Sequence, residues 1–507
     1  MDSLKEVGQQ SNLATISSGG RAAPCAAGLG RPEIGLLQLV SPQLARRHRV
    51  LPWRRDEQGT LRIITDRSDV QLERLLSAVT GMPVCLQVLP LDDVERMIET
   101  YYGRLLRFPP PDSDEAGEGD WAPLAVNEII VAGHRARASD VHLEREGEEV
   151  LVRFRIDGVL HDAGAFRARY LAAVLNRIRL LAGITLADPG APQSGRISLR
   201  GSDREELDVR VSIMPASRGP KVVLRILDRS LIRDGLEKLG LAPRALRRFR
   251  TEIMGRPHGM VLVVGPSGSG KTTTLCNMLG EIDRVADNVV TLEDPVEYTL
   301  SRTTQVQIDG RRGLTFASGL RSLLRQDPDV IVVGEIRDGD AASAAVRAAL
   351  TGHRVFASLH AADAVSAIFR LLDLGVPRHL LAEALSGALA QRLVRRLCPE
   401  CCEEYTPGEG DKEWLHRSGA TEIPGTLMRS TWGCAACAGT GHLGRTGVFE
   451  VLPVDEDLAA LIASGAERRN VLEMALEKGF EPLLQSALRH VISGATSVDE
   501  VMRVIHV

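Results

Sequence analysis

The sequence predicts an α/β protein, with a doubly wound parallel sheet in its second half and smaller α/β domains before it. Three observations predict this fold class. After residue 259, short and wholly apolar runs alternate with helical stretches, which is typical of parallel strands buried on both faces. Between 150 and 227, apolar and polar residues alternate, as they do in half-buried strands. A proline-rich and then acidic stretch at 108–122 separates an N-terminal segment from both.

Composition is compatible with several folded domains and argues against some classes of function. Hydrophobic residues make up 44% and charged residues 25% of the 507 residues, which is enough for several buried cores. The formal net charge of −4 and the aromatic content of 4% argue against a nucleic-acid partner, which would require a basic surface and stacking aromatics. No apolar run approaches the roughly 18 residues that span a bilayer, and no signal-peptide core is found near the start. We therefore expect a cytoplasmic protein.

The chain divides into segments by changes in composition and periodicity. The first residues are rich in Ser, Gly and Ala and lack any period. A strand at 61–65, a helical stretch from Asp69 to Thr80 and a helix capped by Asp92 follow. The predicted segments are a flexible tail at 1–33, an N-terminal domain at 34–107, a linker at 108–122, a middle α/β domain at 123–230, a second linker at 231–243, and a last domain at 244–507 that includes a cysteine lobe at 397–440 and the C-terminal helices.

The strands of the middle domain carry arginines on their polar faces. Apolar residues alternate with charged ones over 150–156, 207–213 and 221–227, so the charged residues of each strand share one side. Arg210 and Arg225 lie within two of these strands. On this pattern alone, a solvated strand face is the alternative to a functional role for either arginine.

A glycine-rich loop directly follows the first apolar strand of the last domain, at 260–264. It has the pattern G-x-x-x-x-G-K-[ST], in which glycines let backbone N–H groups surround an anion at a helix N-terminus. Lys271 is expected to reach the β- and γ-phosphates of ATP, and Thr272 to hold Mg²⁺ through its hydroxyl. An ordinary glycine-rich turn is the alternative. The predicted nucleotide-binding residues are Gly265, Pro266, Ser267, Gly268, Ser269, Gly270, Lys271, Thr272 and Thr273.

Three other strands of this domain lead into polar residues: Glu293, Glu335 and His360 each come at the end of a short apolar run. Because the carboxyl ends of parallel strands lie along one edge of a sheet, we expect these side chains beside the phosphate loop. We expect Glu335 to activate the attacking water, Glu293 to orient Mg²⁺ or water, and His360 to sense the γ-phosphate. Ordinary loop charges and a core histidine are the alternatives.

Most of the cysteines gather late in the chain. Cys398 and Cys401 form one CxxC pair, and Cys434 and Cys437 form another. Two such pairs can supply four thiolates in a tetrahedron, which suits Zn²⁺. No catalytic base accompanies them, so we expect a structural zinc site. Cys402 is left out because its side chain should point away from that of its neighbour. A redox dithiol and unliganded thiols are the alternatives.

Four motifs of the last domain, in this order, resemble those of the secretion ATPase family. Residues 265–272 resemble its Walker A motif, 293–297 its Asp box, 334–338 its atypical Walker B motif and 351–360 its His box. The resemblance extends upstream to 138–144 and 152–158 and covers about 35–507. The cysteine pairs are similar to those of the assembly branch, because the retraction branch lacks them. The short N-terminal segment resembles that of the type II secretion ATPases, with the type IV pilus assembly ATPases as the alternative.

This resemblance implies a RecA-like P-loop NTPase domain, a PAS-like middle domain and a homo-hexameric ring. It also implies that middle-domain arginines reach the phosphates, and Arg196, Arg210 and Arg225 match by their context. The family usually has an acidic residue at the position of Ser194, so the geometry of the loop carrying Arg196 departs from the family pattern.

The implied function is an ATP-hydrolysing motor that powers pseudopilus assembly in type II protein secretion. The N-terminal domain would dock on an inner-membrane secretion platform protein, with acidic lipids as a further partner, and would bring the enzyme to the cytoplasmic face of that membrane. A nucleic-acid translocase and a non-catalytic scaffold that binds nucleotide are alternatives from other classes. The net charge of −4 and the presence of only four tryptophans argue against the first, and the presence of Lys271, Thr272 and Glu335 argues against the second.

Overall fold

The chain folds into two compact units, residues 1–99 and 100–507, which are described one at a time. The predicted tail at 1–33 lies outside the described residues, as do parts of both predicted linkers. The computed structural model describes residues 36, 39–40, 42–56, 58–102, 106–107, 118–185, 190–200, 206–227, 235–420, 422–430, 433–434 and 436–505.

The first unit is built on a three-stranded sheet. Its central strand β2 is antiparallel to β1 and parallel to β3, and α3 forms the crossover between the two parallel strands. The predicted strand at 61–65 and the helix after Asp69 are confirmed, and Asp69 accepts the N–H of Gln71 at 2.8 Å. The elements are α2 (Pro42–His48), β1 (Val50–Arg55), β2 (Leu61–Thr65), α3 (Val70–Thr80), β3 (Val84–Val88) and α4 (Leu91–Tyr102).

The start of α4 differs from the prediction. The helix begins at Leu91, so Asp92 lies in its first turn and is not the cap. The carbonyl of Pro90 already accepts the N–H groups of Asp93 and Val94 at 3.0 Å, which starts the first turn one residue earlier. Asp92 in this position still suits the positive end of the helix dipole.

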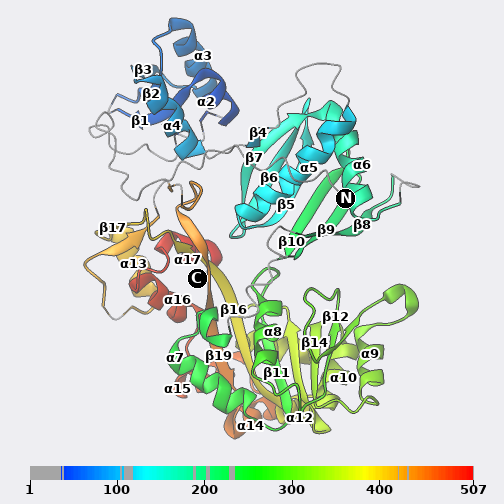
Figure 1. Ribbon diagram of the computed structural model, residues 1–507. Coiled ribbons are helices and arrows are strands. Elements are labelled where there is room, and N and C mark those ends of the chain that lie inside the picture. Colours follow the sequence, from blue (N-terminus) through cyan, green and yellow to red (C-terminus); the bar gives the residue numbers. More distant parts are fainter. Residues whose placement is uncertain are drawn as a thin grey trace. The chain divides into compact units, whose positions relative to one another are not determined.

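The middle part of the second unit is a seven-stranded sheet with two helices packed against it (Figure 1). The strand order is β4-β7-β6-β5-β10-β9-β8, and neighbours are antiparallel except for the parallel pair β4 and β7. Buried residues of α5 and α6 share one core with the apolar faces of the strands. The elements are β4 (Leu106–Arg107), α5 (Glu118–Arg135), β5 (Ala138–Glu146), β6 (Glu149–Ile156), β7 (Val159–Arg167), η1 (Ala168–Tyr170), α6 (Leu171–Leu181), β8 (Gln193–Arg200), β9 (Glu206–Met214) and β10 (Lys221–Leu227).

Arg196 lies within β8, so the prediction of a loop around this arginine was wrong. Residues 193–200 pair with β9 without a register shift. Gly195 is accommodated in this strand because it packs against the end of α6, where a Cβ would lie 2.5 Å from the carbonyl oxygen of Ala182.

The doubly wound parallel sheet predicted for the last domain is confirmed, with strand order β13-β12-β14-β15-β11-β16-β19. All neighbours are parallel except β19, which is antiparallel to β16. Alternate residues of β11 contribute to two different cores, one shared with α10–α12 and the other with α8 and η4. The elements up to β16 are η3 (Leu236–Leu239), α7 (Pro243–Arg248), η4 (Phe249–Met254), β11 (Gly259–Val264), α8 (Lys271–Gly280), β12 (Val289–Glu293), β13 (Thr304–Gln307), η5 (Gly310–Arg312), α9 (Phe316–Leu323), β14 (Val330–Ile336), α10 (Gly339–Leu350), β15 (Arg354–Leu359), α11 (Ala364–Asp373), α12 (Arg378–Ala384) and β16 (Leu385–Leu397).

The cysteine lobe lies between the two ends of a long antiparallel pair, β16 and β19. Their ladder runs from Gly387 opposite Pro453 to Leu397 opposite His442. Apolar side chains of α13 and β18 in the lobe share a core with α16 and α17. The remaining elements are β17 (Glu403–Tyr405), α13 (Glu409–Arg417), β18 (Leu427–Arg429), β19 (His442–Pro453), α14 (Glu456–Ser464), α15 (Arg468–Glu477), α16 (Leu483–Ile492) and α17 (Val498–Val504).

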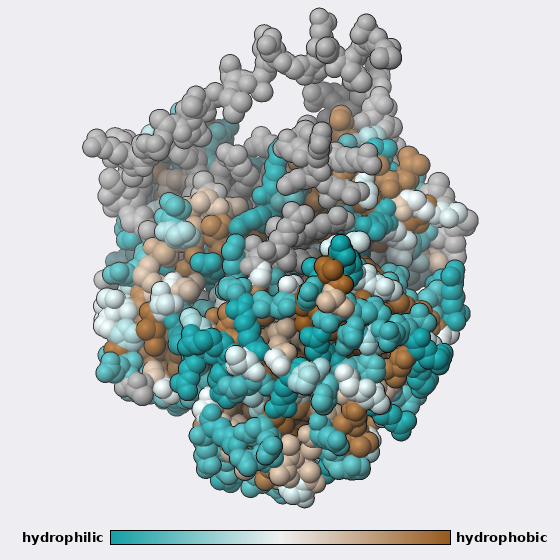
Figure 2. Space-filling model, turned by 60° about the horizontal axis from the view of Figure 1, so that its bottom comes forward, coloured by the Kyte–Doolittle hydropathy of each residue, from teal (hydrophilic) through white to brown (hydrophobic). Residues whose placement is uncertain are grey.

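Among the described residues, no helix has both the length and the apolar character needed to cross a membrane. Figure 2 shows apolar residues in small groups among hydrophilic ones on the face that it draws.

Candidate functional site

The phosphate loop joins β11 to α8, and its backbone depends on glycine. Gly268 and Gly270 have φ angles of 77° and 91°, in the left-handed region that glycine adopts without strain. At Gly265, a Cβ would lie 2.7 Å from the carbonyl oxygen of Gln391 on β16, so no larger residue fits there. The loop therefore holds the N-terminus of α8 directly after β11, where the free N–H groups and the helix dipole favour an anion.

The polar groups of this loop fit a phosphate. Lys271 folds back over the loop, and its Nζ donates to the carbonyl oxygens of Gly265 at 2.8 Å and Pro266 at 3.1 Å. Burial lowers the pKa of Lys271, while the charge of Glu335 opposes this shift. The buried hydroxyl of Ser269 has no hydrogen-bond partner within the described part of the chain. A cation and a buried hydroxyl with unused capacity are the groups that a phosphate would engage.

Glu335 and His360, predicted from different strand ends, lie in direct contact. His360 Nε2 is 3.0 Å from Glu335 Oε1. The other oxygen of Glu335 accepts a 2.5 Å hydrogen bond from Nε of Arg337, whose NH1 also donates to Asp294 at 3.1 Å. Arg337 was not singled out from the sequence. Its position two residues after Glu335 indicated that it lies close to that side chain. Their pairing could not be predicted, because the ladder of β14 and β15 has a register shift between Val333 and Ile336.

Glu293 ends β12 on the same side of the sheet. Its Oε1 accepts hydrogen bonds from the hydroxyl of Thr291 at 2.6 Å and from Nε2 of Gln305 at 2.8 Å, which fix its orientation. A cavity of about 1460 Å³ is lined by the phosphate loop together with Glu293, Glu335 and His360. The structure therefore brings together the three polar side chains that the strand ends predicted.

The middle-domain arginines form a row across the sheet. Arg210 is paired with Arg196 on β8 and with Arg225 on β10, and Arg225 is in turn paired with Asp140 on β5. Arg155 on β6 continues the row opposite Asp140. Directly paired residues lie on one face of a sheet, and like charges in such pairs are destabilising. Asp140 within the row and Asp208 beside it offset part of this repulsion.

Each arginine predicted from sequence or resemblance has a partner of its own. Arg225 donates to Asp140 at 3.1 Å, and Arg196 is held by Asp208, with Nε to Oδ1 at 2.7 Å. Arg210 donates to the carbonyl oxygen of Val296, which belongs to the segment after Glu293. Arg225 is among the residues that line the cavity, whereas Arg196 and Arg210 are not.

Arg155 lines the cavity as well and was missed in the sequence. Its alternation with apolar residues placed it on a polar strand face, but only cross-strand register could show that it extends the row of arginines.

The four predicted cysteine ligands converge. Their sulfur atoms all lie within 4.8 Å of one another. The Sγ–Sγ distances are 3.8 Å for Cys398 to Cys434 and 3.8 Å for Cys401 to Cys437. A tetrahedron with Zn–S bonds of about 2.3 Å has edges of about 3.8 Å, so the donor set fits Zn²⁺. Cys402 lies outside the cluster.

Backbone groups favour the thiolate form within this cluster. Burial opposes ionisation of Cys437, but the N–H groups of Cys434 at 3.0 Å and Gly441 at 3.2 Å point at its sulfur and bring its pKa to about 7. Such N–H donors to a ligand sulfur are common around metal thiolates, because they offset the accumulated negative charge.

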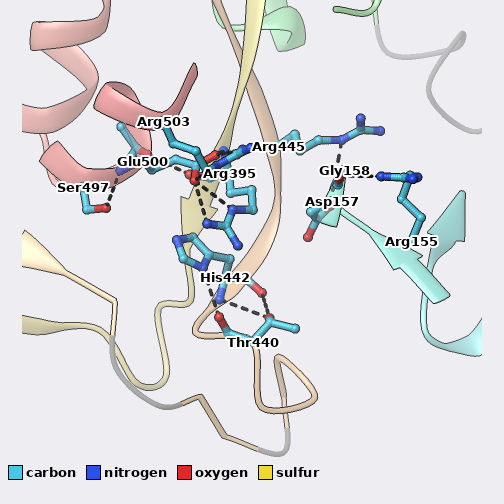
Figure 3. Close-up of polar contacts among 11 residues, drawn as sticks. Arg155, Asp157, Gly158, Arg395, Thr440, His442, Arg445, Ser497, Glu500 and Arg503 are labelled. Atoms are coloured by element: carbon cyan, nitrogen blue, oxygen red, sulfur yellow. Dashed lines mark hydrogen bonds and ion pairs between the residues drawn. The ribbon is translucent and has the colours of Figure 1, made fainter. Parts of the chain in front are cut away.

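The end of β16 next to the cysteine lobe is fixed by a buried ion-pair cluster (Figure 3). Glu500 on α17 accepts hydrogen bonds from Nε and NH2 of Arg395 at 2.9 and 2.7 Å, and from Nε of Arg503 at 2.8 Å. The pKa of Glu500 falls to about 2, because the two arginines outweigh the effect of burial. Figure 3 also shows Arg445 near Asp157, whose Oδ2 accepts the N–H of Gly444 at 2.9 Å.

A phosphate loop after β11 of a doubly wound parallel sheet, with Glu335 near the end of β14, two strands away from β11, defines a P-loop nucleoside triphosphatase. The family model described as "Type II/IV secretion system protein" matches residues 115–503, and that of the MshEN domain matches 30–107. The chain belongs to the type II/IV secretion system protein family.

Several relatives match most of the chain, including the following two. The type II secretion system protein E of Dickeya dadantii is 37% identical over 473 residues, which cover 89% of this chain and 93% of the relative. The type IV pilus assembly ATPase PilB of Myxococcus xanthus is 36% identical over 493 residues, which cover 93% and 86%. The X-ray structure of the Legionella pneumophila ATPase DotB has a TM-score of 0.55 at 20% identity, covers 78% of this chain and 97% of that chain, and shares the fold.

Proposed function

We propose that this chain is the ATP-hydrolysing motor that powers pseudopilus assembly in type II protein secretion. The observation that carries the ATPase part is the position of Glu335. Both of its oxygens are engaged, by His360 and Arg337, and its charge acts on Lys271 of the phosphate loop. These contacts orient Glu335 beside the phosphate site, and because each carboxylate oxygen can accept a further hydrogen bond, Glu335 can still accept a proton from a water molecule.

The roles follow from the positions of the side chains. The loop residues 265–273 bind the phosphates, and Lys271 neutralises their charge. Mg²⁺, which further neutralises the phosphates when bound, would be held through the Thr272 hydroxyl. Glu335 accepts the proton of the attacking water, Glu293 orients the water or the metal's ligands, and His360 responds to the γ-phosphate.

Arg210 and Arg225 are proposed to neutralise charge that develops on the phosphates during hydrolysis. Arg225 lies at the cavity, and Arg210 contacts the segment that follows Glu293. Arg196, held by the buried Asp208, would act by fixing the edge of the row rather than by reaching the nucleotide.

Replacing Glu335 by Gln tests the catalytic assignment. The amide cannot accept a proton from water, so turnover should fall by about 100-fold or more while the Kd for Mg-ADP stays within about threefold. Glu413→Gln is a matched control, because Glu413 is exposed and pairs with Arg417 along its own helix. Turnover of the Glu335→Gln protein equal to that of the parent would exclude this role.

The four cysteines are proposed to hold one structural Zn²⁺ per chain. The support is the 3.8 Å spacing of the sulfur pairs and the N–H groups directed at Cys437. Zinc would cross-link the two ends of the lobe, and a structural ion of this kind stabilises a small lobe that has a limited core of its own.

The assembly proposed is a homo-hexameric ring at the cytoplasmic face of the inner membrane. The N-terminal domain predicted at 34–107 would dock on an inner-membrane secretion platform protein, with acidic lipids as a further partner. The support is family membership and the separate N-terminal domain matched at 30–107.

Type IV pilus assembly is the second candidate function, and the similarity to the Myxococcus xanthus PilB over 93% of this chain favours it. Co-purification separates the two candidates. The motor is expected to be retained by the cytoplasmic part of a type II secretion inner-membrane protein and not by that of a pilus platform protein. The reverse preference would support the pilus function instead.

A further inference from the structure

Gln391 lies beside the phosphate loop, although it is distant from it in sequence. It belongs to β16, whose parallel ladder with β11 ends with Val264 opposite Ala390. Gln391 is the next residue along β16, so it comes level with Gly265, where the phosphate loop begins. Its side chain is almost fully buried, with 1% of its surface exposed.

Both ends of the Gln391 amide are used, and both partners flank the loop. Nε2 donates to the carbonyl oxygen of Ser269 at 2.6 Å, and Oε1 accepts the hydroxyl of Thr274 at 2.7 Å. A carbonyl oxygen can only accept, so the amide orientation is determined by this network. The fit is close, because a Cβ at Gly270 would lie 3.1 Å from Nε2.

The bond to Ser269 has a consequence for the peptide that links Ser269 to Gly270. In a trans peptide the C=O and N–H bonds point in opposite directions. With the carbonyl oxygen of Ser269 held by Gln391, the N–H of Gly270 must point away from β16. This N–H belongs to the G-K-[ST] segment of the loop, whose backbone N–H groups surround the phosphates.

This peptide needs a restraint because a glycine follows it. Gly270 tolerates both signs of φ, so rotation of the peptide plane meets little steric resistance on its side. A rotated peptide would place a carbonyl oxygen, instead of an N–H group, toward a bound phosphate. The hydrogen bond from Gln391 opposes that rotation.

We propose that Gln391 is a positioning residue that keeps the Ser269–Gly270 peptide in its anion-binding orientation before nucleotide arrives. The inference rests on the proposed nucleotide site and adds to it a determinant that lies outside the glycine-rich motif. Because the peptide orientation matters equally for bound substrate and for the transition state, loss of Gln391 should weaken binding and leave the chemical step nearly unchanged.

The test compares Gln391→Met with the parent protein. Methionine keeps the approximate volume and removes both hydrogen bonds. The Kd for Mg-ADP and the KM for ATP are expected to rise about 10-fold, with kcat within about twofold. Gln485→Met is the matched control, because Gln485 is exposed on α16. Unchanged Kd and KM in a folded Gln391→Met protein would overturn the proposal, as would a loss confined to kcat.

A second pair of variants tests the same network from Thr274. Thr274→Val removes the hydroxyl that orients the amide and should raise the Kd for Mg-ADP about threefold, whereas Thr274→Ser should restore it. The double variant Gln391→Met with Thr274→Val should bind no more weakly than Gln391→Met alone, because both changes disrupt one network. Additive losses would contradict a shared role.

These measurements also separate this inference from the proposed function. If the parent protein failed to bind Mg-ADP, the nucleotide site itself would be wrong and this inference would fall with it. If the parent bound Mg-ADP and the Gln391 and Thr274 variants bound it equally well, only the role of Gln391 would be excluded.

Discussion

At the scale of single residues, the site contains carboxylates, Glu335 and Glu293, that are oriented by hydrogen bonds and ion pairs with neighbouring side chains. Glu335 shares its two oxygens between His360 and Arg337, and Arg337 also reaches Asp294. Arg337 thereby connects the end of β14 with the residue that follows β12. A displacement of either segment would alter the contacts of Arg337 with the other. The nearness of Glu335 and His360 could be predicted from sequence, because each lies at the carboxyl end of a parallel strand. The part played by Arg337 could not, because it depends on local backbone geometry near the end of β14.

Arg210 provides a test at this scale. Arg210→Ala should lower ATP turnover by about 100-fold, because a guanidinium that neutralises developing charge is lost, while the Kd for Mg-ADP changes little. Arg218→Ala is the matched control, since Arg218 is an exposed arginine in the turn between β9 and β10. Single-turnover rates and equilibrium titrations on the same preparations provide the comparison. Parent-like turnover of the Arg210→Ala protein would leave Arg210 as a structural contact only.

At the scale of elements, β16 and β19 organise the second half of the chain through contacts between distant residues. Gln391 and Ser269 are 122 positions apart in the sequence, and Arg395 and Glu500 are 105 apart. The apolar runs predicted β11, β12, β14 and β15, and the motif predicted the phosphate loop, but β16 and β19 were not predicted. These contacts between distant residues could not be predicted, because they depend on which strand lies next to which and in what register.

Glu450 on β19 is another such contact, and it joins two helices. It accepts the N–H of Ala364, at the start of α11, and that of Leu483 at 2.9 Å, at the start of α16. Burial raises the pKa of Glu450 to about 7, and the two N–H donors only partly oppose this. Asp363 raises the pKa further, and Arg392 lowers it.

The raised pKa predicts a pH dependence of stability. A carboxyl group with a higher pKa in the folded state stabilises it fully below the unfolded pKa, near 4.5, and this contribution is lost as the pH rises through about 7. The free energy of unfolding should therefore fall by about 2 kcal/mol between pH 5 and pH 8 from this group. Glu450→Gln should remove that part of the pH dependence. Thermal unfolding of both proteins at the two pH values measures this difference. An equal change in stability between pH 5 and pH 8 in the parent and the Glu450→Gln protein would contradict the prediction.

The cysteine lobe gives a second prediction for an element. Cys434→Ser should abolish binding of about one zinc per chain and lower the melting temperature, because the lobe shares its core with α16 and α17. Cys402→Ser should keep the zinc, since Cys402 lies outside the cluster. Metal analysis of reduced, desalted proteins measures the first effect and thermal unfolding the second. Equal zinc content in both variants would mean that the ligand set is different.

At the scale of the whole molecule, the chain combines two compact units, and the second contains both seven-stranded sheets. Within that unit, Asp157 after β6 and Gly444 on β19 connect the middle sheet to the last one at 2.9 Å. Composition and periodicity predicted an order of domains along the chain. The pairing of middle-domain arginines into one row could not be predicted, because like-charged residues on neighbouring strands carry no local signal in the sequence.

A ring-forming motor predicts that activity depends on protein concentration. If subunits complete one another's sites, turnover per chain should rise several-fold between nanomolar and micromolar protein as the oligomer forms, following mass action. Steady-state ATPase rates and sedimentation velocity on the same samples test this. Constant turnover across the range, with monomer throughout, would contradict the proposed assembly.

The cysteine lobe enters and leaves the fold at one point. Leu397 and His442, at its two ends, face each other across the ladder of β16 and β19. Paired positions on neighbouring strands lie only about 5 Å apart, a gap that an ordinary tight turn bridges. A relative without the lobe could therefore keep the same sheet and the same register, and a single insertion or deletion could add or remove the lobe in evolution. In such a relative, the apolar side chains of α16 and α17 that pack against the lobe would have to be replaced by polar residues or packed against another element.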